Sequence, residues 1–151
     1  MALGSAGATA LTIAASAAIK TTNDSVATTA KVTGNKASIA DNVATSFAKL
    51  VANNNEIHGH LTFVYNIEDP GNNIGVGTKT FRVFFNGGTT LLDAIQSDTT
   101  IFNPTITATA SGTDFTLKIQ MDVSSSTYSL DYSLEFLAHN SSASSVDIVE
   151  V

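Results

Sequence analysis

The chain lacks cysteine and tryptophan, and it has only seven Lys plus Arg against 13 Asp plus Glu in 151 residues. Without cysteine, disulfides, thiol redox chemistry and Cys-ligated metal sites are excluded. The formal net charge of −6 argues against a nucleic-acid backbone as a partner. Charged residues make up 13% of the chain, so small polar residues must supply much of the surface. Such a surface suits a packed assembly as well as a monomer.

The beginning of the chain is poor in both charge and large apolar side chains, and its first charged side chain after Met1 is Lys20. It lacks the basic start and leucine-rich centre of a signal peptide. It is also too polar for a membrane span, which needs about 20 predominantly apolar residues. We therefore expect no cleaved signal and no membrane partner. Small side chains repay the entropy of ordering only against another surface, so we expect residues 1–33 to be a mobile arm that pairs with a neighbouring subunit.

The clearest pattern lies in residues 115–138, where large apolar and polar side chains alternate in two arms. The apolar rows are Phe115, Leu117, Ile119, Met121 and Val123, then Tyr128, Leu130, Tyr132, Leu134 and Phe136. Successive side chains of a strand point to opposite faces, so each row lies on one face. Serines and Thr127 separate the arms, which predicts an antiparallel hairpin. Leu117, Ile119, Leu130, Tyr132 and Leu134 are expected to be buried between two sheets.

Further strand-like segments are separated by turn residues, and they comprise residues 9–16, 25–33, 38–51, 60–67, 79–85, 105–110 and 146–151. Residues 38–51 also fit one face of a helix, but their β-branched side chains favour a strand. Residues 90–96 are the one helix-like piece, with Thr90 as the cap. Gly34-Asn35 is expected to end a strand, and residues 53–55 and 68–77 are expected to be a turn and a loop.

About eight strands with turns between them predict an all-β fold, a jelly-roll-like antiparallel β-sandwich with an extended N-terminal arm. Residues 1–37 are expected to form the arm or edge strands. Residues 38–151 are expected to form the sandwich domain.

Two groups of residues are candidate metal ligands. His58 and His60 lie at i and i+2, on one face of a strand, but zinc needs a third ligand and His139 is the only other histidine. The loop from Glu68 to Asn73 is rich in side-chain oxygens, with Asn66 just before it and Asp69, Asn72 and Asn73 within it. Its spacing is not that of a calcium loop, and the same residue types form ordinary turns. For both groups the structural interpretation is favoured, so we predict no metal.

No catalytic or cofactor-binding residue is nominated by the sequence. None of the serines lies in a Gly-x-Ser-x-Gly elbow. No carboxylate pair stands out for glycoside hydrolysis, which depends on spatial separation. Gly75-Val76-Gly77 lacks the further glycine and the lysine of a phosphate loop. We expect the protein not to be an enzyme and to need no cofactor.

Three stretches resemble small β-sandwich proteins of tailed-bacteriophage virions, of the capsid decoration or cement type. They are residues 39–46 (IADNVATS), 60–69 (HLTFVYNIED) and 124–140 (SSSTYSLDYSLEFLAHN). The resemblance covers about residues 38–140 and implies a virion surface protein. It also implies association as a homotrimer, with the major capsid protein and other copies of the chain as partners.

Two hypotheses follow for the function. The first is a structural protein on the capsid surface, a trimeric jelly roll that clamps capsid subunits. The second is a tail- or fibre-borne domain that binds a host receptor or glycan. An exposed aromatic platform would favour the second, and Phe84 is the one aromatic side chain on the polar side of its strand.

Overall fold

A computed structural model describes residues 19–22, 27–52, 56–86, 89–122, 127–139 and 146–151. The regular secondary structure of these residues consists of β-strands, and none of the described residues lies in a helix. The expected strand at residues 9–16 lies outside the described residues, as do the turn at 53–55 and the serine-rich segments 124–126 and 141–145. Among the described residues there is accordingly no helix of the length and hydropathy that crossing a bilayer requires.

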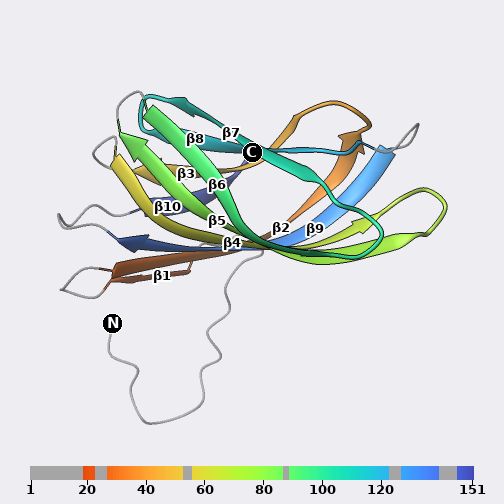
Figure 1. The fold of residues 1–151 in the computed structure, drawn as a ribbon, viewed down its shortest axis with the longest axis horizontal. Helices are drawn as coiled ribbons and strands as arrows, with labels where there is room; N and C mark the ends of the chain where they lie inside the picture. The colour runs from red at the N-terminus through yellow and green to blue at the C-terminus, as the bar shows by residue number, and fades with distance from the viewer. Residues whose placement is uncertain (1–18, 23–26, 53–55, 87–88, 123–126, 140–145) are drawn as a thin grey trace, which may run out of the picture.

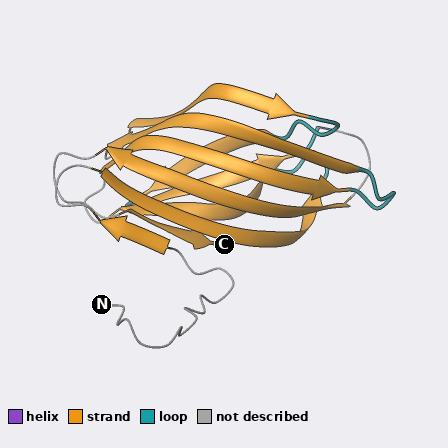
Figure 2. Ribbon diagram, turned by 90° about the horizontal axis from the view of Figure 1, so that it is seen from below, coloured by secondary structure: helices purple, strands orange, loops and turns teal. Residues whose placement is uncertain are grey.

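The strands form two antiparallel sheets that pack face to face (Figure 1). The six-stranded sheet has the order β1 (Ile19–Thr22), β2 (Ala27–Ala40), β9 (Thr127–His139), β4 (Glu56–Glu68), β5 (Ile74–Asn86) and β6 (Thr89–Thr99). The four-stranded sheet has the order β10 (Val146–Glu150), β3 (Thr45–Ala52), β8 (Asp114–Gln120) and β7 (Thr105–Ser111). Long strands run side by side along the molecule (Figure 2). The all-β sandwich expected from the sequence is confirmed.

The chain passes repeatedly from one sheet to the other, which gives the sandwich its roll-like topology. β2 pairs with β9 in the six-stranded sheet, and β3, which follows β2, pairs with β8 in the four-stranded sheet. The crossing from β2 to β3 occurs at Asp41 and Asn42. Asn42 has a φ of 54°, and its backbone N–H donates to the carbonyl of Met121 over 2.9 Å. The single strand expected at residues 38–51 is therefore two strands with a corner between them.

The core is a continuous apolar layer between the two sheets. Leu117, Ile119, Leu130 and Leu134 are completely buried, and Tyr132 is 5% exposed. Phe63 lies at the centre of an aromatic group, 5.3 Å from the ring of Phe47 and 5.2 Å from that of Tyr65. The inward-facing rows expected from the alternating pattern are thus confirmed, except at Val123, which lies outside the described residues.

The expected hairpin between the two alternating arms is wrong. β8 belongs to the four-stranded sheet, where it pairs with β3 and β7, whereas β9 pairs with β2 and β4 in the six-stranded sheet. Alternation tells which face of a strand is buried, and it is the same for strands that adjoin in one sheet and for strands that face each other across a core.

Two glycines that the sequence assigns to turns lie inside strands, because each makes room for a tyrosine. Gly34 is opposite Tyr132 on β9, and Gly77 is opposite Tyr65 on β4. A Cβ atom on Gly34 would lie 2.5 Å from the Tyr132 ring, and one on Gly77 would lie 2.4 Å from the Tyr65 hydroxyl. Glycine inside a strand often marks such a close approach. The expected strand end at Gly34-Asn35 is therefore wrong, and the expected loop at 68–77 is shorter because β5 begins at Ile74.

The helix expected at residues 90–96 is also wrong, since this segment belongs to β6. The register between β5 and β6 shifts between Thr80 and Phe81, so that Gln96 and Ala94 face consecutive residues of β5. A β-bulge of this kind inserts an extra residue and interrupts the period of two. Leu91 and Ile95 are exposed, whereas Leu92 packs on the core. The interrupted period gives these apolar residues a spacing similar to that in a helix.

Residues 27–33, which the sequence assigns to the arm, form the first half of β2. They pair with β9 from Ala27 to Thr33, and Ala30 and Val32 are each 1% exposed. The expected domain boundary between residues 37 and 38 falls inside this strand. Residues 1–18 lie outside the described residues.

Candidate functional site

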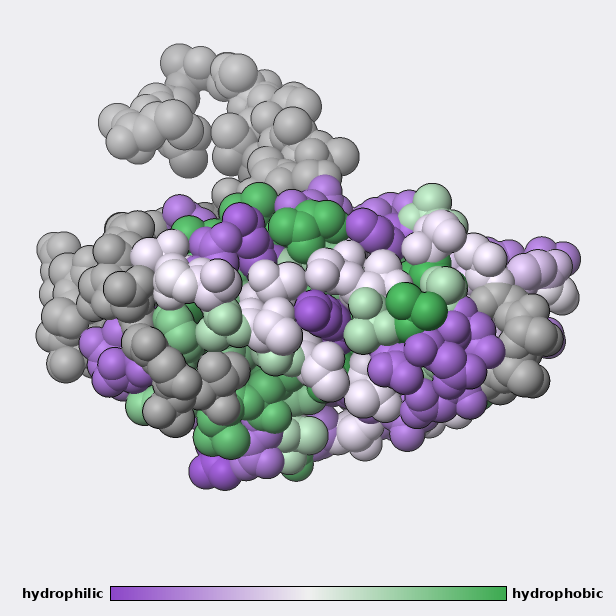
Figure 3. Space-filling model, turned by 90° about the horizontal axis from the view of Figure 1, so that it is seen from above, coloured by the Kyte–Doolittle hydropathy of each residue, from purple (hydrophilic) through white to green (hydrophobic). Residues whose placement is uncertain are grey.

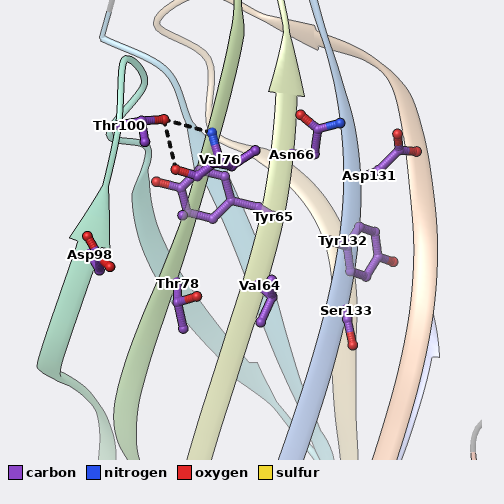
Figure 4. A pocket seen from close by; sticks show the side chains of 11 residues that line it. Val64, Tyr65, Asn66, Val76, Thr78, Asp98, Thr100, Asp131, Tyr132 and Ser133 are labelled. Atoms are coloured by element: carbon purple, nitrogen blue, oxygen red, sulfur yellow. Dashed lines mark hydrogen bonds between the residues drawn. The ribbon is translucent and has the colours of Figure 1, made fainter.

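An open groove of about 580 Å³ lies on the outer face of the six-stranded sheet (Figure 4). Strand register builds it from two adjacent cross-strand rows of side chains. One row runs Ser133, Val64, Thr78 and Asp98, and the next runs Asp131, Asn66 and Val76, followed by Thr100. Tyr65, Gly77 and Tyr132 complete the lining. Because most of the outward side chains are small, the middle of this face is hollow.

Hydrogen bonds fix both ends of the groove. The Thr100 hydroxyl donates to the carbonyl of Val76 over 2.9 Å and accepts from its N–H over 2.8 Å. At the other end, the side-chain amide of Asn35 donates to Asp131 over 2.6 Å. On each side of the groove, a side chain therefore forms hydrogen bonds to a residue of the neighbouring strand.

Two tyrosines beneath the groove fasten the sheet to the rest of the sandwich. The Tyr65 hydroxyl donates to the carbonyl of Phe102 over 2.9 Å, and the Tyr132 hydroxyl donates to the carbonyl of Phe47 on β3 over 3.0 Å. Burial, and then the negative charge of Asp98, raise the pKa of Tyr65 to about 12. Burial, and then Glu150, raise the pKa of Tyr132 as well. Both phenols are therefore neutral at ordinary pH and position the strands that form the groove floor.

The groove carries negative charge and hydrogen-bond acceptors. Asp98 and Asp131 stand near opposite sides of it, and Asn66 lies between them (Figure 4). The amide oxygen of Asn66 is buried and has no hydrogen-bond partner among the described residues. None of the lining residues is Lys, Arg or His.

The two histidines lie on the same outer face as expected, but at the other end of β4. His58 stacks on Phe84 with ring centroids 4.7 Å apart, and its Nε2 lies 3.1 Å from a Glu56 carboxylate oxygen. His60 lies opposite Arg82 on β5, which pairs with Asp93. His139 is the last residue of β9, and its side chain is outside the described part. The described residues contain no group of three His, Cys, Asp or Glu side chains that could hold a metal.

Within the segment 68–73, the Asp69 carboxylate oxygens build the β4–β5 turn. The Asp69 carboxylate accepts from the backbone N–H of Gly71 over 2.8 Å, and from the backbone and side-chain N–H groups of Asn73 over 2.9 Å each. These bonds, chiefly those from Asn73, lower the pKa of Asp69. Asn72 has a φ of 60°, a conformation that asparagine tolerates better than most residues. These contacts are those of a turn, and the absence of a metal stays a prediction.

Sequence reasoning found Asn66 but not the rest of the groove. Its lining comes from β4, β5, β9 and the end of β6, which are adjacent only in the folded sheet. In the sequence, the polar row of β9 pointed to one side of the groove, because Asp131 and Ser133 alternate with large apolar residues. Phe84, expected to be exposed, is half-buried because it packs on His58.

Comparison with solved structures shows a similarity of fold but no match in sequence. The chain matches no protein-family model, and no curated protein matches its sequence. Its fold is similar to part of the tailspike protein of Acinetobacter phage vB_ApiP_P1, with a TM-score of 0.50 and 11% sequence identity. The match covers 80% of this chain and 22% of the tailspike, so the chain spans about a fifth of that protein's length. At this identity the likeness shows a shared fold.

Proposed function

We propose that the chain is a non-enzymatic structural module of a bacteriophage virion, carried on a tail spike or tail fibre. The observation that supports this proposal is the tailspike fold similarity over 80% of the chain. It agrees with the virion resemblance of residues 39–46 and 60–69. We propose the tail rather than the capsid surface because the protein with the similar fold is a tailspike.

The surface chemistry supports a role in contact rather than in catalysis. Two acidic side chains pair with lysines on neighbouring strands: Asp114 with Lys49 over 2.7 Å, and Glu135 with Lys31 over 3.8 Å. The face shown in Figure 3 mixes pale, weakly polar side chains with separate purple and green patches. A surface of this kind lets subunits approach closely without strong like-charge repulsion.

One edge of the four-stranded sheet supports assembly with further chains. β7 is one of the two edge strands of the four-stranded sheet, and its seven residues, Thr105–Ser111, contain no charged side chain. An edge strand presents unpaired backbone N–H and C=O groups that a strand from another chain can complete. A homotrimer, proposed from the virion resemblance, would use such edges, and light scattering should then give about three times the 15.6 kDa chain mass.

The location is tested by fractionating purified virions into heads and tails and quantifying the chain in each by mass spectrometry. We expect the chain in the tail fraction, at a copy number far below that of the major capsid protein. Recovery on heads, at a copy number comparable with that of the major capsid protein, would instead establish capsid decoration and overturn the tail assignment.

A further inference from the structure

The two sides of the sandwich differ in how well they are closed. On one side the Lys36 ammonium, on β2, donates to the carbonyl of Val151, just after β10, over 2.8 Å, and so ties the two sheets together. The other side is formed by β6 and β7, each of which is an edge strand of its sheet. In the described part of the chain, no strand pairs with their outer edges. A further strand can therefore be added on this side.

Inward-facing apolar side chains between β6 and β7 are covered only in part. Strand register places Leu92 and Ala94 of β6 beside Val83 and Phe81, which are buried in the core. Leu92 is nevertheless half-buried and Ala94 is exposed. The inward-facing side chains of β7 pack on the core and are half-buried as well: Ile106, Ala108 and Ala110. We call the space between Leu92 and Ala94 on one side and these three residues on the other the mouth.

We propose that residues 9–16 of a second copy of the chain fill the mouth, as a strand added to the free edge of β7. This segment, TALTIAAS, lies outside the described residues, and its alternation predicts a strand. Its eight residues match the length of β7, which has seven. The proposal rests on the self-association proposed above, and it names the two surfaces that meet.

The two faces of such a strand fit the two sides of β7. Leu11 and Ile13 share one face, which would lie in the mouth and cover Leu92 and Ala94. Thr12 lies on the other face, between two alanines. That face would continue the outer row of β7, which consists of Thr105, Thr107, Thr109 and Ser111. Backbone hydrogen bonds supply the pairing, and they do not require large side chains.

The path of the chain places the segment out of reach of its own β7. Only Ala17 and Ala18 connect residues 9–16 to Ile19, where β1 begins. β1 and β6 are the opposite edges of the six-stranded sheet, five strand spacings apart, or about 24 Å. Two connecting residues span at most about 11 Å. The mouth must therefore belong to another copy, and a contact between different surfaces of successive copies can close into a ring such as the proposed trimer.

The nearer free edge, that of β2 beyond its pairing with β1, suits the segment less well. Ile19 lies opposite Lys31, whose side chain is 50% exposed on the outer face. If the segment continued β1 along β2, Leu11 and Ile13 would share the face of Ile19, because both lie an even number of residues from it. Both side chains would then lie in water. The mouth of a second copy would bury them instead.

Disulfide cross-linking tests the contact, because the chain has no cysteine of its own. Thr107→Cys, in the exposed outer row of β7, is mixed with full-length variants that carry one cysteine at each position from 10 to 15. After oxidation, mass spectrometry quantifies the linked peptides that join the two variants. Side chains on one face of paired strands come close enough for a disulfide.

The expected result is an alternating yield. Positions 10, 12 and 14 share the face of Thr107 and should include the strongest cross-link. Positions 11, 13 and 15 face the mouth, and their yield should be at least about tenfold lower. Equal yields at all six positions, or no cross-link at any of them, would overturn the proposal.

Matched variants separate the mouth from a general attraction between copies. Thr33→Cys places the cysteine at another exposed threonine, on the outer face of β2, and should give no cross-link with Thr12→Cys of another copy. Added to the Thr12→Cys variant, Ile13→Asp puts a charge in the mouth and should lower its yield with Thr107→Cys at least about tenfold. Ala14→Asp, on the outer face, should lower it less. If Thr33→Cys cross-links as strongly as Thr107→Cys, the contact is not specific for β7 and the proposal is wrong.

A double variant tests the edge of β2. Continuing the register from Ile19 and Lys31 places position 15 opposite position 35, so Ala15→Cys and Asn35→Cys are combined in one chain. An internal disulfide in this variant, without cross-links between copies, would place the segment on its own β2 and overturn the proposal.

The outcome is separable from those of the proposed function. A trimer by light scattering that gives no cross-link to Thr107→Cys would retain the self-association and reject this contact. Cross-links between copies of a chain found on heads would retain the contact and reject the tail location.

Discussion

Side chains that point inward and outward from β9 alternate along one strand, yet they differ in almost every physical property. Leu130, Tyr132 and Leu134 are 0–5% exposed and fill the space between the sheets. Asp131 and Ser133, between them, line the outer groove. The inner face is constrained by volume, because interiors are close-packed. The outer face is constrained only by hydrogen bonding and charge.

The largest expected effect comes from a charge on the inner face. Leu130→Asp places an unpaired carboxylate in a completely buried position, and we expect it to abolish soluble folding. The matched control is Leu137→Asp on the outer face of the same strand, where the leucine is 37% exposed and the charge stays hydrated. Soluble yield and circular dichroism compare the two. A wild-type-like Leu130→Asp protein would contradict the face assignment.

The next largest effect on stability is expected from removing an aromatic ring, with one variant for the inner face and one for the outer face of the six-stranded sheet. Phe63→Ala removes a completely buried ring that contacts Phe47 and Tyr65, and should cost about 3–5 kcal/mol of unfolding free energy. Phe84→Ala removes the outer ring stacked on His58 and should cost about 0.5–1.5 kcal/mol. Urea denaturation measures both. Equal losses would mean that the outer stacking matters as much as core packing.

A smaller effect concerns the buried phenol beneath the groove. The pKa of Tyr65 is raised from 10.0 to about 12 in the folded chain, so the folded state holds its proton more tightly than the unfolded state. Its contribution to stability is full below pH 10 and is lost as pH rises towards 12. Tyr65→Phe should flatten this alkaline loss in urea midpoints measured across that range.

Asp98→Asn provides the control for the tyrosine. This variant removes the negative charge that raises the pKa of Tyr65 and leaves the larger cause, burial, in place. It should therefore reduce the loss of stability at alkaline pH only in part. An unchanged alkaline profile in Tyr65→Phe would show that other groups, such as Tyr132, dominate it.

The smallest expected effect lies in the turn between β4 and β5. Asp69→Ala removes a carboxylate that accepts three hydrogen bonds, so the thermal midpoint at neutral pH should fall slightly. The lowered pKa of Asp69 means that its contribution is present above the unfolded value of 3.8 and is lost as pH falls further. The variant should therefore show less acid sensitivity than the parent. Asp122→Ala, which removes one 3.3 Å contact with Thr105, is the matched control and should change the midpoint less.

Alternation along the chain was sufficient to assign faces but insufficient to assign neighbours. The inward rows of β8 and β9 were predicted residue by residue, because a strand exposes every second side chain to one environment. Their assignment to a hairpin failed, because pairing depends on the path of the chain between sheets. Glycines show the same limit: Gly34 and Gly77 are turn residues by composition, and only the tyrosines on neighbouring strands explain why they lie within β2 and β5.

The sequence by itself determined the all-β class, the buried rows and the acidic, weakly charged surface. These follow from local periodicity and composition, which act over a few residues. Tertiary structure alone decided which strands adjoin, where the β5–β6 bulge makes Leu91 and Ile95 exposed, and that Asn66, Asp98 and Asp131 meet in one groove. The groove residues lie up to 69 positions apart, from Val64 to Ser133, and hydrogen-bond register across four strands brings them together. Register is a property of strand pairs, so no single stretch of sequence contains it.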